Sequence, residues 1–246
     1  MFPFKSKRTS LKDAAVMNGF TDYHSHILPG IDDGVKTPEE SLKILGLYEK
    51  AGVGDLWFTP HVMADVPNTT ENIKEKFGQI TRLYQESAAK AELTGTIRLH
   101  IAAEYMLDSL FEERLENNDL LPLGKSGMHL LVETSFYNPP YNFWDMMERI
   151  KSHGYFPVIA HPERYLYMNR KDYARLKEMD VRFQLNLGSL CGLYNSDSKA
   201  RAEMLVKNRW YNLAGSDTHS YTMINAILDK KEVNVKSLEV FRNLEL

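Results

Sequence analysis

From about residue 20 to its end, the chain alternates between short apolar runs and longer amphipathic stretches. This alternation is typical of repeated βα units, in which helices cover a parallel sheet. Seven of the apolar runs have the length of a strand, which predicts an α/β fold with seven strands. The expected strands lie at 20–26, 55–61, 96–104, 128–133, 155–161, 181–187 and 210–217.

The clearest helix signal follows Thr37. Thr37 and Glu40 have the spacing of a capping box, Pro38 suits the first helical position, and Gly52 suits the residue after the end. The amphipathic stretches near 70–92 and 142–153 predict two further helices of the outer layer.

The composition is that of a globular protein, with 43% hydrophobic and 26% charged residues among 246. No linker, repeat or low-complexity tract interrupts the pattern, so a single domain over residues 1–246 is the simpler interpretation. Residues 1–18 lack a strong periodic pattern, and we expect them to form a flexible N-terminal arm.

Charge and cysteine content narrow the function classes. The net charge of -3, from 30 basic and 33 acidic residues, favours neither nucleic acid nor an anionic membrane as a partner. No apolar run has the length of a signal peptide or membrane span. Cys191 is the single cysteine, so no internal disulfide can form, and the cytoplasm is the expected location.

The strongest chemical signal is the segment TDYHSHILPGIDDG. His24 and His26 lie two residues apart on an expected strand, so their rings point to the same face and can reach one ion. Asp33 follows in the loop after this strand.

Other metal-type ligands end several further strands, where the loops of a βα barrel assemble an active site. Such groups are costly at buried strand ends unless they are paired or bound to metal. Together with Asp33, the set holds five histidines and four carboxylates, more than the roughly four to six ligands that one ion takes, so two or three divalent ions are implied. Ligands without thiolate suit manganese, iron or zinc, and residue types do not choose among them. The added candidates are His61, Glu104, Glu133, His161, Asp217 and His219.

These motifs resemble the PHP (polymerase and histidinol phosphatase) family. The DDG after the His-x-His pair, Glu133 and the segment AHPERY further resemble the capsule-operon tyrosine phosphatases of the CpsB and YwqE type. The resemblance implies a distorted (β/α)7 barrel with its metal site at the C-terminal strand ends, and three ions that are often manganese. It also implies hydrolysis of phosphotyrosine, through attack by a metal-bound hydroxide, on the C-terminal tail of the tyrosine kinase that regulates exopolysaccharide export.

The resemblance further implies how the ligands are shared. The first ion would be held by His24, His26, Glu104 and Asp217. The second ion would share Glu104 with the first and would also be held by Glu133 and His161. The third ion would be held by Asp33, His61 and His219.

Arg164 lies three residues past His161, where its guanidinium is expected to bind phosphate through two parallel hydrogen bonds and to act in catalysis. The alternative is a salt bridge at the rim. The family tends to carry a second arginine after the SDxH motif, but this chain reads SYTMIN after His219, which leaves the second phosphate contact in doubt. Arg170 and Lys171 are open as substitutes.

Four loop aromatics are expected either to stack on a phenyl phosphate ring or to pack over their own scaffold, and Tyr165 is the predicted substrate contact. No C-x₅-R motif surrounds Cys191, which disfavours a cysteine phosphatase. A small-molecule phosphatase such as histidinol phosphatase, and a non-catalytic phosphotyrosine-binding module, stay open as alternatives. The aromatics are Phe136, Tyr137, Tyr141 and Tyr165.

Overall fold

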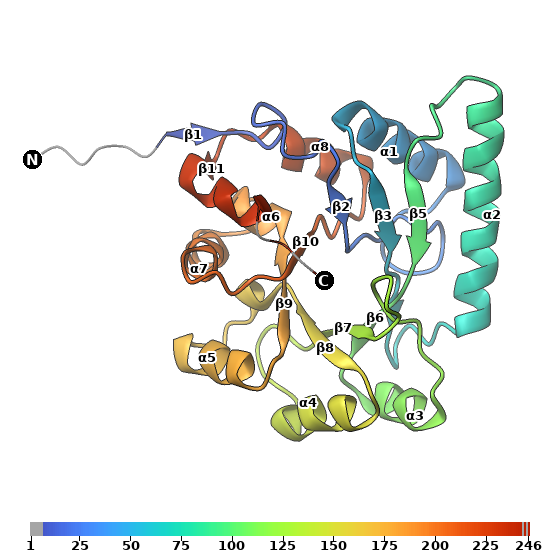
Figure 1. The fold of residues 1–246 in the computed structure, drawn as a ribbon. Coiled ribbons are helices and arrows are strands. Elements are labelled where there is room, and N and C mark those ends of the chain that lie inside the picture. Colours follow the sequence, from blue (N-terminus) through green and yellow to red (C-terminus); the bar gives the residue numbers. More distant parts are fainter. Residues whose placement is uncertain (1–6, 243, 245) are drawn as a thin grey trace, which may run out of the picture.

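Seven parallel strand positions curl around a common interior, and each overlaps a run predicted from the sequence (Figure 1). The computed structural model describes residues 7–242, 244 and 246. Two of the seven runs are assigned as two short strands each. Hydrogen bonds from Ala102 N to Phe58 O (2.9 Å) and from Glu104 N to Pro60 O (3.1 Å) carry the pairing across both interruptions. These runs are β3 (Asp55–Phe58) with β4 (His61–Val62), and β5 (Arg98–Ile101) with β6 (Glu104–Met106).

The strands pair in sequence order. One sheet runs β2-β3-β5 and the other runs β4-β6-β7-β8-β9-β10, and all of these pairs are parallel. Tyr23 N donates to Ala214 O at 3.1 Å, and Ser25 bridges Thr218 in parallel, so the last strand returns to the first. The curled parallel sheet expected from the sequence is therefore confirmed. The remaining strands are β2 (Thr21–Asp22), β7 (His129–Glu133), β8 (Phe156–Ala160), β9 (Arg182–Asn186) and β10 (Leu213–Gly215).

The helices lie around the outside of the strands, as Figure 1 shows. The helix predicted after Thr37 is α1, where Thr37 Oγ1 accepts a hydrogen bond from Glu40 N and Gly52 ends the helix at φ 86°. The other two predicted helices are α2 and α4. The helices are α1 (Pro38–Ala51), α2 (Thr70–Ala89), α3 (Ser109–Asn117), α4 (Phe143–Ser152), α5 (Arg170–Glu178), α6 (Leu187–Leu190), α7 (Ser196–Lys207) and α8 (Tyr221–Asp229), with 3-10 turns η1 (Pro162–Arg164) and η2 (Val235–Arg242).

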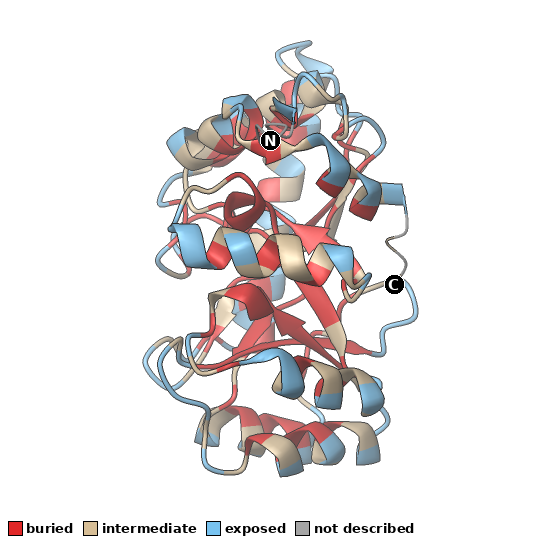
Figure 2. Ribbon diagram, turned by 90° about the vertical axis from the view of Figure 1, so that its left-hand side faces the viewer, coloured by how far each residue is buried: buried red, intermediate tan, exposed pale blue. Residues whose placement is uncertain are grey.

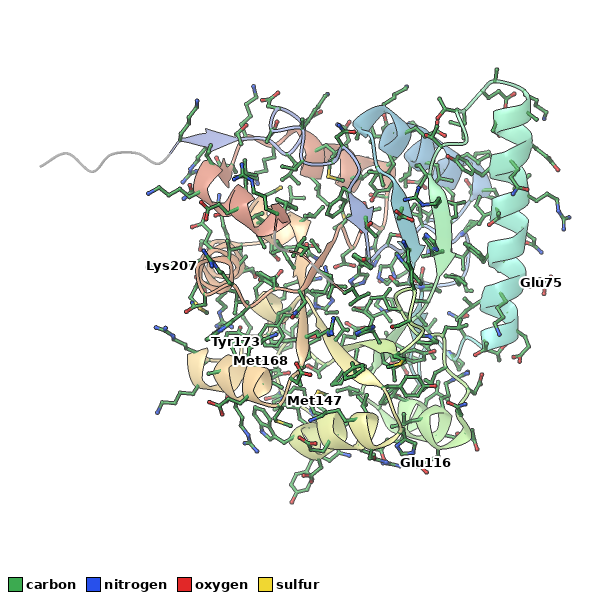
Figure 3. The ribbon with its side chains drawn as sticks, in the orientation of Figure 1. Glu75, Glu116, Met147, Met168, Tyr173 and Lys207 are labelled. Atoms are coloured by element: carbon green, nitrogen blue, oxygen red, sulfur yellow. The ribbon has the colours of Figure 1, made fainter. Side chains whose placement is uncertain are left out.

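Apolar side chains fill the space between the helices and the strands. Figure 2 shows that most of the central strands are buried and that the longer helices are buried on one face and exposed on the other. In Figure 3, Met147 and Tyr173 lie inside this layer, whereas Glu75 and Lys207 project at the rim. Within the described part of the chain, none of the helices is both long and apolar enough to cross a membrane.

The segment before the barrel is also packed. Strand β1 (Arg8–Thr9) pairs antiparallel with β11 (Val233–Asn234), and Leu11 and Met17 are buried in the core. Residues 7–18 are therefore a packed part of the domain rather than the expected flexible arm, because apolar side chains anchor them. The rest of that expected arm, residues 1–6, lies outside the described residues.

Candidate metal centre

All nine predicted ligands meet at the C-terminal ends of the strands. Each has a nitrogen or oxygen atom 3.0–3.4 Å from another member of the set. We call this set the ligand cluster; it consists of His24, His26, Asp33, His61, Glu104, Glu133, His161, Asp217 and His219. Six strand positions contribute, so segments separated by up to almost two hundred residues become neighbours, as a βα barrel allows.

The local backbone aims these side chains inward. His161 (φ 36°) and Asp217 (φ 52°) follow closely after strands and have left-handed backbone, which is uncommon for residues other than glycine. Gly34 and Gly215 lie against the His-x-His segment: a Cβ at Gly34 would be 2.0 Å from His26 O, and one at Gly215 would be 2.4 Å from His24 Cβ. Only glycine permits this approach, so both loops fix the two histidines.

Glu104 is at the centre of the ligand cluster. Its Oε2 atom lies 3.2 Å from Nε2 of both His24 and His26 and 3.1 Å from His61 Nδ1, and its Oε1 lies 3.0 Å from His161 Nε2. Glu133 Oε1 lies 3.1 Å from the same His61 nitrogen. One carboxylate therefore contacts four imidazole rings, which is the arrangement of a bridging ligand.

The cluster is closed at its base and open on one side. His24, His26 and Glu104 are fully buried, whereas the side chains of His219 and Asp33 are 28% and 71% exposed. Asp33 Oδ1 lies 3.4 Å from His219 Nε2 and 3.5 Å from His61 Nε2. Water and a phosphate ester would reach the cluster from this side.

The charges of the cluster stabilise one another. Burial lowers the pKa of His24, but the Glu104 and Asp217 carboxylates outweigh it and raise the pKa to about 9. Burial alone would raise the pKa of Glu104, and the surrounding imidazoles hold it well below its usual range. The hydrogen bond from His219 lowers the pKa of Asp33 to about 2. Without metal, His24 therefore keeps a proton that a bound cation would displace.

The donor atoms fit a divalent cation better than they fit one another. His24 Nε2 and His26 Nε2 face each other at 2.9 Å beside two carboxylates. Among the described residues, Glu104 Oε2 and His61 Nδ1 are buried without a hydrogen-bond partner. Buried polar atoms are rarely left unpaired, and nitrogen and oxygen donors that converge in this way suit cations.

Three groups of donors each lie within 4.8 Å, close enough for their members to hold one ion. They differ from the sets that the resemblance implies: His61 takes the place of His161 beside Glu104 and Glu133, and His26 joins the outer group. Asp217 and His161 belong to none of the three groups, although each contacts a member of one. The groups are His24, His26 and Glu104; His61, Glu104 and Glu133; and His26, Asp33, His61 and His219.

Arg164 lies beside the cluster, in η1. Its Nη1 donates to Asp217 Oδ2 at 2.8 Å, and its side chain is 21% exposed. Burial lowers the pKa of the guanidinium, but Asp217 and other nearby groups outweigh it and raise the pKa, so the group stays charged. Of the suggested substitutes for a second arginine, Arg170 instead donates to Asn208 Oδ1 at 3.3 Å.

The expectation for Tyr165 needs correction. Its side chain has no exposed surface, because it packs against Phe136, His161 and Tyr167 with ring centroids 5.6–6.0 Å apart. A substrate ring cannot stack on it in this arrangement. Tyr141, by contrast, is fully exposed.

Sequence reasoning missed the residues that orient the ligands. Asp32 Oδ2 accepts from His26 Nδ1 at 2.9 Å, and Gln184 Oε1 accepts from His24 Nδ1 at 2.9 Å. Asn186 Nδ2 donates to Asp217 Oδ2 at 2.8 Å. Gln184 and Asn186 lie at the C-terminal end of β9. Polar amides at the end of an otherwise apolar strand could have indicated that these residues orient the ligands.

Known proteins match this chain over most of its length. The sequence pattern of a family described as "Capsular polysaccharide synthesis, CpsB/CapC" matches residues 20–235. The tyrosine-protein phosphatase CpsB of Streptococcus pneumoniae is 30% identical over 207 residues, 81% of this chain and 82% of that protein. The tyrosine-protein phosphatase YwqE of Bacillus subtilis (strain 168) is 29% identical over 205 residues, 81% of this chain and 77% of that protein.

Solved structures share the fold. One, from a set of crystal structures of Bacillus subtilis YwqE and Streptococcus pneumoniae CpsB, which are described as unique metal-dependent tyrosine phosphatases, superposes with a TM-score of 0.73 at 24% identity. The superposition covers 91% of this chain and 86% of that one. The lactonase Lmo2620 from Listeria monocytogenes gives a TM-score of 0.55 at 10% identity, over 98% and 96% of the two chains. Both likenesses bear on the fold alone.

Proposed function

The chain belongs to the CpsB/CapC family of capsular polysaccharide synthesis, and from this premise we propose that it is a metal-dependent tyrosine-protein phosphatase. The observation that carries the proposal is the ligand cluster with Arg164 at its edge, since it combines metal donors with a cation that can bind phosphate. The substrate is a protein that carries phosphotyrosine.

The nine residues of the ligand cluster are proposed to hold two or three divalent ions, and manganese is the proposed metal, with iron or zinc as the alternatives. When bound, such ions activate water near neutral pH and stabilise negative charge on phosphoryl oxygens. Arg164 supplies the proposed protein contact to the phosphate: Nη1 donates to Asp217, and the other N–H groups of the guanidinium are proposed to donate to the substrate.

The proposed physiological substrate is the tyrosine-phosphorylated C-terminal tail of the kinase that regulates exopolysaccharide export. The resemblance to the capsule-operon phosphatases supports this choice. The enzyme is proposed to act in the cytoplasm, and the buried thiol of Cys191 is compatible with a reducing compartment.

The test is hydrolysis by the purified full chain. With manganese it should hydrolyse p-nitrophenyl phosphate and a tyrosine-phosphorylated peptide, and both activities should disappear with a chelator or in His161→Ala. Full activity after removal of all metal, verified by elemental analysis, would contradict the proposed function.

Two controls separate the alternatives. Specificity constants for the phosphopeptide and for histidinol phosphate, measured side by side, distinguish a protein phosphatase from a small-molecule phosphatase. Tight binding of the phosphopeptide without release of phosphate over long incubation would indicate a non-catalytic binding module instead.

A further inference from the structure

Asp217 divides its two oxygens between two kinds of neighbour. Oδ1 faces the ligand cluster, 3.3 Å from His26 Nε2 and 3.5 Å from His24 Nε2. Oδ2 accepts two hydrogen bonds of 2.8 Å each, from Arg164 Nη1 and Asn186 Nδ2. Because both donors hold Oδ2, Oδ1 alone is directed toward a metal ion.

Tyr194 continues this network. Its hydroxyl accepts a hydrogen bond from Asn186 Nδ2 at 3.2 Å, and its ring lies close to Gly188. A Cβ at Gly188, in α6, would be 3.1 Å from Tyr194 Cε2 and 3.0 Å from Asn186 Oδ1, so a larger residue there would press on both side chains. Asn186 Oδ1 also accepts from Ser189 N at 3.1 Å, which fixes the amide group.

The guanidinium of Arg164 lies between two aromatic rings. Its Cζ atom is 4.3 Å from the centroid of Tyr194 and 4.4 Å from that of Phe136. Cation–π contacts on both faces, together with the bond to Asp217, restrict its rotation. The edge of the guanidinium stays available for a phosphate group, and the side chain is 21% exposed there.

We propose that Tyr194 and Asn186 are positioning residues: Tyr194 holds Arg164 in a phosphate-binding orientation, and Asn186 holds Asp217 so that one oxygen faces the metal. The inference rests on the proposed function and deepens it. Neither residue touches the reacting atoms. Because this chain lacks an arginine after the SDxH motif, phosphate binding depends on the orientation of the Arg164 guanidinium. Loss of the Tyr194 ring should therefore weaken phosphate binding through Arg164.

The experiment measures binding of inorganic phosphate to the manganese-loaded full chain by calorimetry, with metal content and melting temperature measured in parallel. Tyr194→Ala should weaken phosphate binding about tenfold, within the range found when groups that orient a site are removed. Tyr194→Leu keeps apolar volume over Gly188 but removes the π face, and it should weaken binding to a similar extent. Tyr194→Phe keeps the ring and should bind within about threefold of the wild type.

A double-mutant cycle tests whether Tyr194 acts through Arg164. Once Arg164→Ala has removed the guanidinium, adding Tyr194→Ala should cause no further loss of phosphate affinity. Asn186→Ala should instead lower the manganese content, because Asp217 loses one of the two donors that orient it. Tyr155→Ala, a tyrosine whose hydroxyl contacts Asn118 outside the site, is the matched control and should leave phosphate affinity unchanged.

Additive losses in the cycle, or a Tyr194→Phe variant as weak as Tyr194→Ala, would overturn the role of the ring. Unchanged metal content in Asn186→Ala would overturn the role of the amide. If the wild type binds phosphate but hydrolyses no phosphopeptide, the proposed function is wrong. The double-mutant cycle, which measures phosphate affinity alone, still tests whether Tyr194 positions Arg164.

Discussion

The carboxylate of Asp32 accepts a hydrogen bond from His26 Nδ1, with 2.9 Å between the two atoms. The same Oδ2 atom accepts from His61 N at 3.1 Å, and Oδ1 accepts from Gly34 N at 2.9 Å. The bond places the proton of the neutral ring on Nδ1, so that Nε2 faces the ligand cluster with its lone pair. Asp32 is thus a hydrogen-bond partner of a proposed metal ligand, and both of its carboxylate oxygens are engaged in hydrogen bonds.

Asp32→Ala should therefore weaken manganese binding about 10- to 100-fold, the usual effect of removing a carboxylate that orients a ligating histidine. Metal titration followed by calorimetry measures this change. Asp65→Ala, which removes an exposed acid from the loop after β4, is the control and should leave the affinity unchanged. Equal affinities for Asp32→Ala and the wild type would show that the tautomer of His26 does not depend on this bond.

Glu104→Gln keeps the shape of the central side chain and removes its charge. Since Glu104 contacts four imidazole rings, the variant should lose at least one ion and lower phosphatase activity by more than about 100-fold, beyond the effect of an outer partner. Elemental analysis and steady-state kinetics measure the two effects, and circular dichroism checks the fold. Glu75→Gln, on the exposed face of α2, controls for the loss of an acid. A fully active Glu104→Gln protein would exclude Glu104 as a bridging ligand.

Cys191 should be inert toward alkylating reagents. Burial raises the pKa of its thiol to about 12, and Sγ donates to Ile227 O at 3.3 Å, so little thiolate forms near neutral pH. Mass spectrometry after treatment with iodoacetamide should find the native chain unmodified and the unfolded chain labelled once. Cys191→Ala should keep its metal-dependent activity. Rapid labelling of the native chain with loss of activity would point to a thiol-based reaction.

The sequence predicted the strand positions and the convergence of the nine candidate ligands, because both follow from the order of strands in a parallel barrel. Their role as metal ligands stays a prediction. Apolar runs indicated the strand positions. Glu133 ends β7 and His161 directly follows β8, where a parallel barrel must bring side chains together, whereas Glu104 begins β6 after the interruption that follows β5. The alternation of apolar and polar stretches therefore carried most of the information about the site.

What the sequence did not predict depends on local turns and packing. In the DDG segment, the Asp32 side chain turns back to His26 and Gly34, whereas the more exposed Asp33 side chain faces His219. Two adjacent acids cannot be told apart by a sequence pattern. Tyr165 follows η1 in a loop, yet its ring is buried because Phe136, His161 and Tyr167 pack around it, and a sequence pattern does not show such contacts. Gln184 was overlooked because amides are not metal ligands of the usual type, although they orient them.

His129 should make the stability of the fold depend on pH. Burial, with a smaller contribution from Arg182, lowers the pKa of its ring to about 4, below the value of roughly 6.5 expected in the unfolded chain. As the pH falls below about 6.5, the His129 ring takes up a proton in the unfolded chain before it does so in the folded chain. The contribution of the neutral ring to the free energy of unfolding is therefore complete above about pH 6.5 and is lost as the pH falls toward 4.

In His129→Gln this contribution is absent at every pH. The free energy of unfolding of the wild type minus that of the variant should therefore decrease between about pH 7.5 and pH 4.5, when both are measured by denaturant titration of metal-free protein. The histidines of the ligand cluster titrate in both proteins and cancel in the difference. An NMR titration that places the midpoint of the His129 ring near 4 would support the assignment. A midpoint near 6.5 would contradict it, because the buried ring would then accept its proton as readily as a ring in water.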